Sequence, residues 1–76
     1  MTIDCTPSTE QRLRARGISF RDVWLVISEP DYGVPSEGGN RKTFGTIGDK
    51  RLCVITRKLD DDHTLLIEAW WVSKKT

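Results

Sequence analysis

The spacing of the apolar residues changes partway along the chain, and this change restricts the fold to one that combines helices with a sheet. Up to residue 30 they recur at intervals of three and four, as on one side of a helix, whereas from residue 41 onward β-branched and aromatic runs dominate. The turn-rich stretch EPDYGVPSEGGN separates the two halves. A chain of 76 residues is long enough for one domain, residues 1–76, which we expect to be of the α+β class.

The first half predicts two helices, over about 7–16 and 19–29. Thr6 is a suitable N-cap for the first helix, Pro7 suits its first position, and Gly17 can end it in the left-handed conformation. Ser19 can cap the second helix, with Asp22 bonding back to it, and Pro30 prevents its continuation. The spacing of four apolar residues in the second helix predicts one buried face, made of Phe20, Val23, Trp24 and Ile27.

The second half predicts an antiparallel sheet of three strands, or four, that follows a loop over residues 30–40. The three strands are expected at about 41–47, 51–59 and 64–72, with a tight hairpin at Gly48-Asp49. Strand alternation places one apolar set beneath the helices: Leu52, Val54, Leu65, Ile67, Ala69 and Trp71. The opposite face, with Arg57, Glu68 and Trp70, is expected to be open to water or to a partner.

Composition limits the classes of function. The formal net charge is only +1, so binding to a nucleic acid would depend on local clusters of basic residues. No run of about eighteen apolar residues and no signal peptide is evident, so we expect a cytoplasmic protein without a membrane partner. Two cysteines, Cys5 and Cys53, are expected to be free thiols. The only histidine, His63, follows three aspartates in a turn, a pattern without metal-ligand spacing, and we expect neither a metal nor a cofactor.

The basic and aromatic residues of the expected open face suggest one chemistry, the cleavage of RNA without a metal. This reaction needs positive charge beside the phosphate, a group that moves protons, and often an aromatic plane for a base. Arg12, Arg16, Arg41, Lys42 and Arg57 can supply the charge, Trp70 the plane, and Glu68 or His63 the proton transfer. The same residues also allow a purely structural interpretation, in which Arg57 and Glu68 form a cross-strand ion pair and Trp70 is a partly buried sheet residue.

Two stretches, RLRARGISFRDVWLVISEP and NRKTFGTIGDKRLCVIT, resemble a small bacterial family, domain of unknown function 4258, which looks like a relative of the BrnT and RelE ribonuclease toxins. The resemblance runs from about residue 6 to 71. Its anchors are Arg12-Leu13, the corner Arg16-Gly17-Ile18-Ser19, Pro30, Arg41 and the run from Leu52 to Ile55. Family members often carry a histidine four residues before the arginine that matches Arg12, and Ser8 stands at that position here.

The resemblance implies a fold in which two helices cover one face of the sheet and RNA lies on the other. It implies a toxin-like, metal-independent endoribonuclease, with Arg57, Glu68 and His63 as candidate catalytic residues. Candidate RNA-binding residues are then Arg12, Arg16, Arg41, Lys42 and Trp70. The expected partners are RNA, an antitoxin-like protein or a second copy of the chain. The alternative is a non-catalytic module that keeps the toxin-like fold and binds an antitoxin-like protein or a second copy of itself. A third possibility is non-specific binding of RNA or DNA without cleavage.

Overall fold

A computed structural model describes residues 1–72 of the chain and has the expected α+β architecture. Two helices and five strands are present in this part, and a short 3-10 helix over Glu37–Gly39 precedes the third strand. In chain order the elements are β1 (Thr2–Cys5), α1 (Pro7–Ala15), α2 (Phe20–Ser28), β2 (Tyr32–Pro35), β3 (Arg41–Ile47), β4 (Lys50–Lys58) and β5 (His63–Val72).

The sheet is larger than predicted and is mixed instead of wholly antiparallel. Its strand order is β1-β5-β4-β3-β2, with β1 parallel to β5 and all other neighbours antiparallel. The expected meander of three strands forms its centre. The prediction of a plain loop over residues 30–40 is wrong, because β2 lies within it at the edge of the sheet. Gly33 and Pro35 are typical of a loop and hide the strand in the sequence pattern, but an edge strand tolerates proline.

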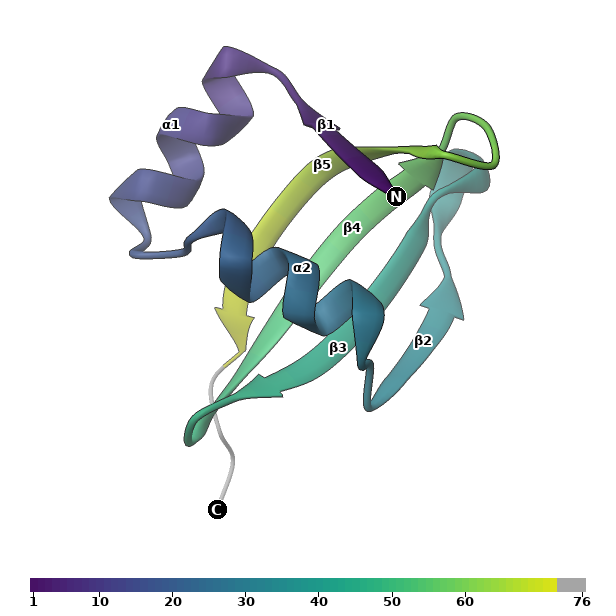
Figure 1. The fold of residues 1–76 in the computed structure, drawn as a ribbon. Coiled ribbons are helices and arrows are strands. Elements are labelled where there is room, and N and C mark those ends of the chain that lie inside the picture. The colour runs from purple at the N-terminus through teal and green to yellow at the C-terminus, as the bar shows by residue number, and fades with distance from the viewer. Residues whose placement is uncertain (73–76) are drawn as a thin grey trace.

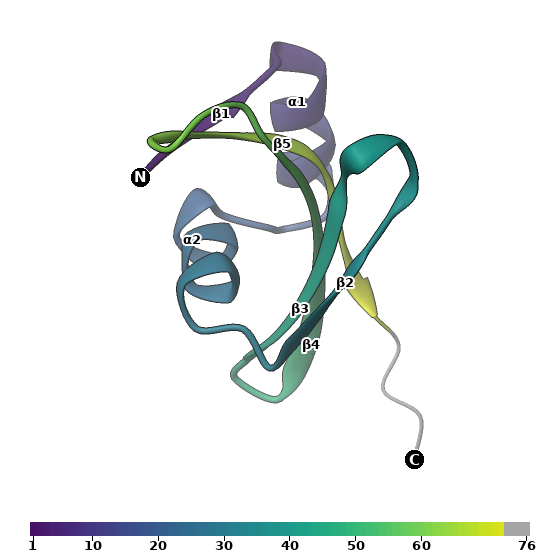
Figure 2. The same ribbon diagram turned by 90° about the vertical axis from the view of Figure 1, so that its right-hand side faces the viewer.

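Both helices pack on the same face of the sheet and leave the other face uncovered (Figures 1 and 2). Helix α2 packs on β3 and β4, and α1 packs on β5. The core lies between these helices and the sheet and contains Leu13, Ile18, Val23, Val26, Leu52, Val54, Leu66 and Ala69. The other face of the sheet has no helical layer over it among residues 1–72, which agrees with the predicted open face.

The predicted helix ends are confirmed. The Thr6 hydroxyl accepts a hydrogen bond from the backbone N–H of Thr9 at 3.3 Å, and Pro7 occupies the first position of α1. Gly17 has a positive φ of 68°, which lets the chain turn sharply into α2. Ser19 and Asp22 then form a complete capping box, because each side chain accepts from the other residue's backbone N–H.

Replacing Ser19 by alanine should therefore lower the free energy of unfolding by about 1 kcal/mol, since the backbone N–H of Asp22 loses the hydroxyl that accepts its hydrogen bond. Urea unfolding followed by tryptophan fluorescence would measure the change. Ser28→Ala, at the exposed last position of α2, is the matched control and should change the stability little. Equal effects of the two substitutions would contradict the role of the capping box.

Helix α2 is rotated relative to the prediction. Val23 and Val26 are its buried residues, whereas Phe20 and Trp24 are 43% and 49% exposed. Gly45 on β3 explains the rotation: a β-carbon placed there would lie 2.9 Å from Cγ2 of Val26. The missing side chain thus leaves the space that Val26 occupies. Because residues 23–27 are all apolar, the sequence of the helix alone does not fix which side faces the sheet.

The prediction that Leu65 and Ile67 are buried in the core is wrong, because β5 contains a β-bulge. Ile55 pairs with Glu68, but the next residue of β4, Thr56, pairs with Leu66, so Ile67 is an extra residue in β5. The bulge reverses the alternation on its N-terminal side, and Leu66 enters the core instead of Leu65 and Ile67. On its C-terminal side the predicted alternation holds, with Ala69 buried and Trp71 packed against the core.

Candidate RNA-binding face

Three aromatic side chains and one cysteine form a row across the open face of the sheet. Trp70 on β5 pairs with Cys53 on β4, Cys53 pairs with Phe44 on β3, and Phe44 pairs with Tyr32 on β2. The Tyr32 and Phe44 rings are stacked, with their centres 4.6 Å apart. Directly paired residues project from the same face of a sheet, so Trp70, Cys53, Phe44 and Tyr32 form one line, which we call the aromatic row.

Cations lie on both sides of the aromatic row. Nζ of Lys42 is 5.9 Å from the centre of the Trp70 ring, and Cζ of Arg51 is 5.7 Å from the centre of the Tyr32 ring. Such cation–π contacts contribute about 0.5–1 kcal/mol at exposed sites and hold each charge beside an aromatic plane. Planes for stacking bases and charges for phosphates alternate on this surface, as they do on proteins that bind single-stranded nucleic acid.

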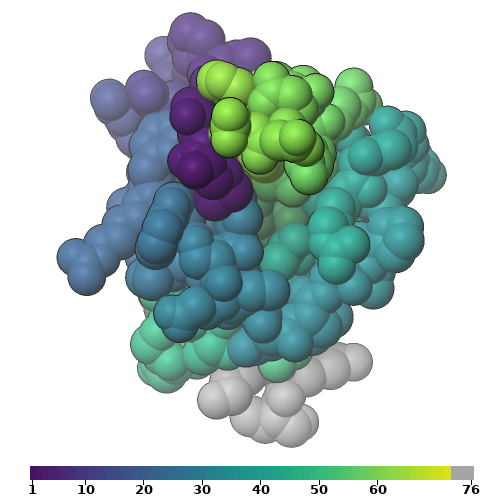
Figure 3. Space-filling model, turned by 45° about the vertical axis from the view of Figure 1, so that its right-hand side comes forward, coloured from purple at the N-terminus to yellow at the C-terminus, as the bar shows by residue number. Residues whose placement is uncertain are grey.

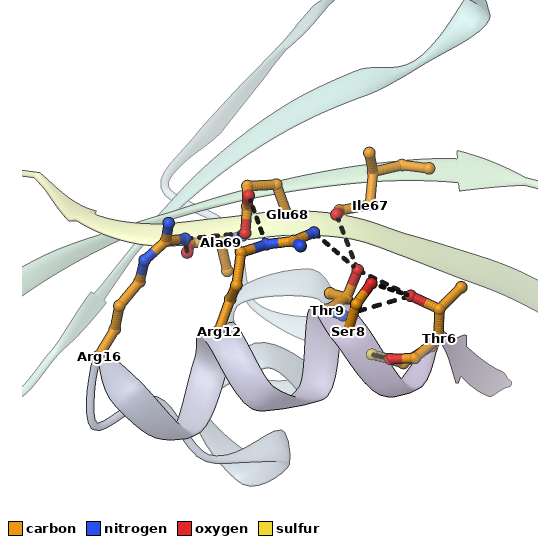
Figure 4. Close-up of polar contacts among 9 residues, drawn as sticks. Thr6, Ser8, Thr9, Arg12, Arg16, Ile67, Glu68 and Ala69 are labelled. Carbon is orange, nitrogen blue, oxygen red and sulfur yellow. Dashed lines mark hydrogen bonds and ion pairs between the residues drawn. The ribbon is translucent and has the colours of Figure 1, made fainter.

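A second feature lies at the β5 edge of the same face. Arg12 and Arg16, one helical turn apart on α1, both bind the carboxylate of Glu68 (Figure 4). Nε of Arg12 is 3.1 Å from Oε2, and Nη1 of Arg16 is 2.8 Å from Oε1. We call Arg12, Arg16 and Glu68 the Glu68 cluster. The arginine side chains remain 43% and 37% exposed, so an approaching phosphate can reach both guanidinium groups.

Hydrogen bonds between α1 and β5 hold the Glu68 cluster in place. They lie along the part of β5 that extends past its last pair with β1, where the strand has a free edge. Nη1 of Arg16 donates to the carbonyl oxygen of Ala69 at 2.7 Å, and the Thr9 hydroxyl donates to that of Ile67 at 3.4 Å. In the opposite direction, the indole N–H of Trp71 donates to the carbonyl oxygen of Arg16 at 2.8 Å. These contacts occupy backbone groups that a sheet edge would otherwise expose.

The Glu68 cluster and the aromatic row are neighbours. Glu68 precedes Trp70 by two residues on the same strand, so both side chains project from the open face. In the next row along the sheet, Glu68 pairs with Ile55, and Ile55 pairs with Lys42. The structure therefore brings together five of the eight sequence-predicted site residues: Arg12, Arg16, Lys42, Glu68 and Trp70.

The other three predicted residues lie elsewhere. Arg57 is on the open face, but its guanidinium group donates to Asn40 Oδ1 at 2.8 Å and to the carbonyl oxygen of Gly38 at 3.1 Å, which ties the 3-10 turn to β4. His63 lies 3.3 Å from an Asp4 carboxylate oxygen, at the start of β5 and about 15 Å along the strand from Glu68.

Arg41 is separated from the candidate face by the sheet itself. Its side chain lies over Gly33 and lines a hollow on the face that the helices cover. Alternation along β3 explains this separation, since Lys42 is the neighbour of Arg41 and projects from the opposite face.

Three residues of the candidate face are absent from the sequence-based set: Tyr32, Phe44 and Arg51. Alternation in the run RKTFGTI already places Phe44 on the same face as Lys42, and alternation in the second strand does the same for Arg51. Strand alternation could not place Tyr32, because the sequence predicts a loop for the segment that contains it. Only the pairing of β2 with β3 brings its ring onto Phe44.

The position of Cys53 within the aromatic row leads to a prediction about thiol reactivity. Cys53 is fully buried, and burial raises the pKa of its thiol, although nearby Lys42 acts in the opposite direction. A thiol-specific reagent should therefore modify the half-buried Cys5 first and reach Cys53 only when the protein unfolds. Cys5→Ser should abolish the fast reaction under native conditions. Rapid modification of two thiols per folded chain would contradict the burial of Cys53.

Comparisons with known proteins leave the family open: the chain matches no family model, no curated protein and no solved structure. In the described part of the chain, neither helix is long and apolar enough to cross a membrane. Among residues 1–72, no three histidine, cysteine, aspartate or glutamate side chains gather in a group that could hold a metal ion. The resemblance to the BrnT and RelE toxins is therefore retained as a prediction.

Proposed function

We propose that the protein is a toxin-like, RNA-binding protein of the RelE and BrnT type, and that it binds single-stranded RNA across the open face of its sheet. The observation that carries this proposal is the aromatic row with Lys42 and Arg51 beside it. Bases stack on aromatic planes in a sequence-tolerant way, and the adjacent cations meet the phosphates. A duplex keeps its bases stacked inside and cannot use such planes.

Fluorescence anisotropy with a labelled RNA of about twelve nucleotides tests this proposal. We expect the single strand to bind more tightly than the same sequence in a duplex, and the affinity to fall as salt increases because cations contribute. Arg51→Gln should weaken binding, whereas Arg21→Gln, an exposed cation on α2, should not. Equal affinity for single and double strands, or equal effects of the two substitutions, would contradict binding on the open face.

Cleavage of the bound strand is the activity that the resemblance adds, and the Glu68 cluster is where the geometry best supports it. Two guanidinium groups there can neutralise charge on a phosphate, and Trp70 lies beside them to hold a base. Both oxygens of Glu68 contact arginine, so proton transfer from a ribose hydroxyl requires one ion pair to open as the phosphate binds. Arg57 and His63 lie outside this cluster.

Incubation of RNA with the protein in EDTA tests cleavage separately from binding. We expect products ending in a 2′,3′-cyclic phosphate from the unmodified protein and at least a hundredfold slower cleavage by Glu68→Gln, since proton transfer typically contributes that much. Asp4→Asn, which alters the distant His63 pair, is the control and should cleave normally. RNA that is bound but left intact would restrict the function to binding.

A second candidate function is the binding of an antitoxin-like protein on α2, and the exposed aromatic pair Phe20 and Trp24 favours it. Beside Phe20, a hollow of about 200 Å³ between α1 and α2 could receive an apolar side chain. Co-expression with the product of an adjacent antitoxin-like reading frame would test this function. Copurification that survives Phe20→Ala and Trp24→Ala would contradict docking at this place.

A further inference from the structure

A hollow of about 290 Å³ opens on the helix-covered side of the sheet, beyond the end of α2 (Figure 3). Figure 3 shows it between α2, the turn that joins β4 to β5, and the segment that leads from β2 to β3. Helix α2 ends at Ser28 and Pro30 prevents its continuation, so the helical cover stops short of the sheet here. At the same point the side chains on this face of the sheet change from apolar to polar.

The floor of this hollow consists of threonines from three adjacent strands. Thr43 on β3 and Thr56 on β4 are only 6% and 7% exposed, and Thr64 follows on β5. A threonine hydroxyl can donate one hydrogen bond and accept others, so the floor can serve a ligand that carries several oxygen atoms. On the opposite side, Ile27 and Pro30 supply an apolar wall.

Two cations border the hollow. Arg41 belongs to none of the ion pairs found among residues 1–72. Lys58 is 3.9 Å from Asp61, but both side chains are largely exposed, so this pair contributes little and leaves the ammonium group free to move. None of the described residues that line the hollow is acidic. The charged side chains that line the hollow are thus both cationic, and the acidic residues of the adjacent turn, Asp60, Asp61 and Asp62, lie outside its lining.

Gly33 allows the Arg41 guanidinium group to lie over the hollow. A β-carbon placed on Gly33 would be 2.9 Å from Nη2 and 3.0 Å from Nε of Arg41, so close that the guanidinium group would have to shift. Any other residue at this position would displace the guanidinium group. Gly33 has no positive φ, so its backbone conformation does not require a glycine, and the missing side chain is what leaves room for the guanidinium group.

We propose that this hollow binds the phosphate of a small phosphomonoester, with Arg41 and Lys58 as the cations and Thr43 and Thr56 as hydroxyl partners. The planar guanidinium group matches phosphate oxygens in a two-pronged arrangement, and the ammonium group adds a second charge. The volume is close to the lower limit for small-molecule pockets, about 300 Å³, so the site admits one compact molecule. Its organic part, such as a ribose, lies against Ile27 and Pro30.

This site is independent of the proposed RNA-binding face, because Arg41 and Lys42 project from opposite sides of β3. Its test uses the protein alone, labelled with nitrogen-15, titrated with adenosine 5′-monophosphate and observed by amide chemical shifts. We expect saturable shifts at Gly33, Thr43 and Thr56. Adenosine without its phosphate should cause none, and inorganic phosphate should bind more weakly because it does not contact the apolar wall.

Two variants separate a binding site from general attraction of anions. Arg41→Ala should weaken binding at least tenfold. Gly33→Ala should have a comparable effect although it preserves every charge, and its unfolding midpoint should stay close to that of the unmodified protein because only a flexible side chain must move. Arg21→Ala is the matched control and should bind normally.

Three results would overturn the proposal. The first is an affinity in Arg41→Ala and in a folded Gly33→Ala that equals that of the unmodified protein. The second is a set of shifts spread over basic residues throughout the chain, and equally sensitive to Arg21→Ala. The third is inorganic phosphate binding as tightly as the nucleotide, which would contradict a phosphomonoester ligand.

Discussion

Replacing Leu66 by alanine should lower the free energy of unfolding by about 2–5 kcal/mol, whereas the same change at its neighbour Leu65 should have a clearly smaller effect. Leu66 is 1% exposed and belongs to the core, while Leu65 is only half-buried on the opposite side of β5. A chain of this size is expected to be stable by only about 4–11 kcal/mol in total, so Leu66→Ala would remove a large part of the stability.

The two leucines also test the β-bulge, because without the extra residue Ile67 the alternation of β5 would bury Leu65 instead. Urea unfolding curves of both variants would measure the difference. Leu59→Ala provides a control for removing an exposed leucine from the same part of the chain, with an expected change within about 0.5 kcal/mol. A larger effect at Leu65 than at Leu66 would contradict the register of β5.

Replacing Trp70 by alanine should weaken the binding of single-stranded RNA about 5- to 150-fold. One base loses its stacking plane, a contribution of about 1–3 kcal/mol, and Lys42 loses the ring that positions its charge. Anisotropy titrations at a single fixed salt concentration would measure the change.

Trp24→Ala is the matched control for Trp70→Ala, since it removes an indole that is exposed on α2, away from the open face. We expect its RNA affinity to equal that of the unmodified protein. A loss caused by Trp24→Ala, together with normal binding by Trp70→Ala, would place the RNA on the helical side and contradict the proposed face.

Local signals in the sequence predicted the helix ends and the central meander correctly. Thr6, Gly17 and the pair Ser19 and Asp22 act through contacts within a few residues, so their effect can be inferred without knowing the rest of the fold. The hairpin that joins β3 to β4 is similar: Gly48 has a positive φ of 64°, as its turn requires.

The differences arise where contacts distant in sequence decide the structure. Strand β1 forms because β5 offers it a parallel edge, and a run of four residues such as TIDC gives no independent indication of that partner. The rotation of α2 depends on Gly45, and the burial of Leu66 depends on the bulge. None of these relations is visible in a local periodicity.

The candidate site was predictable in part for the same reason. Alternation along strands correctly placed Glu68 and Trp70 on one face, and helical spacing correctly paired Arg12 with Arg16. That both arginines meet Glu68 could not be inferred, because it depends on how α1 lies along the edge of β5. The hydrogen bonds that hold Arg57 to the 3-10 turn depend in the same way on tertiary structure.

Amide chemical-shift mapping with a short single strand of RNA tests the central claim most directly, because it reports which face of the sheet the strand contacts. We predict saturable shifts concentrated at Lys42, Phe44, Cys53 and Trp70, with little change along α2. Shifts concentrated on α2, or none at RNA concentrations that saturate the anisotropy signal, would contradict the account.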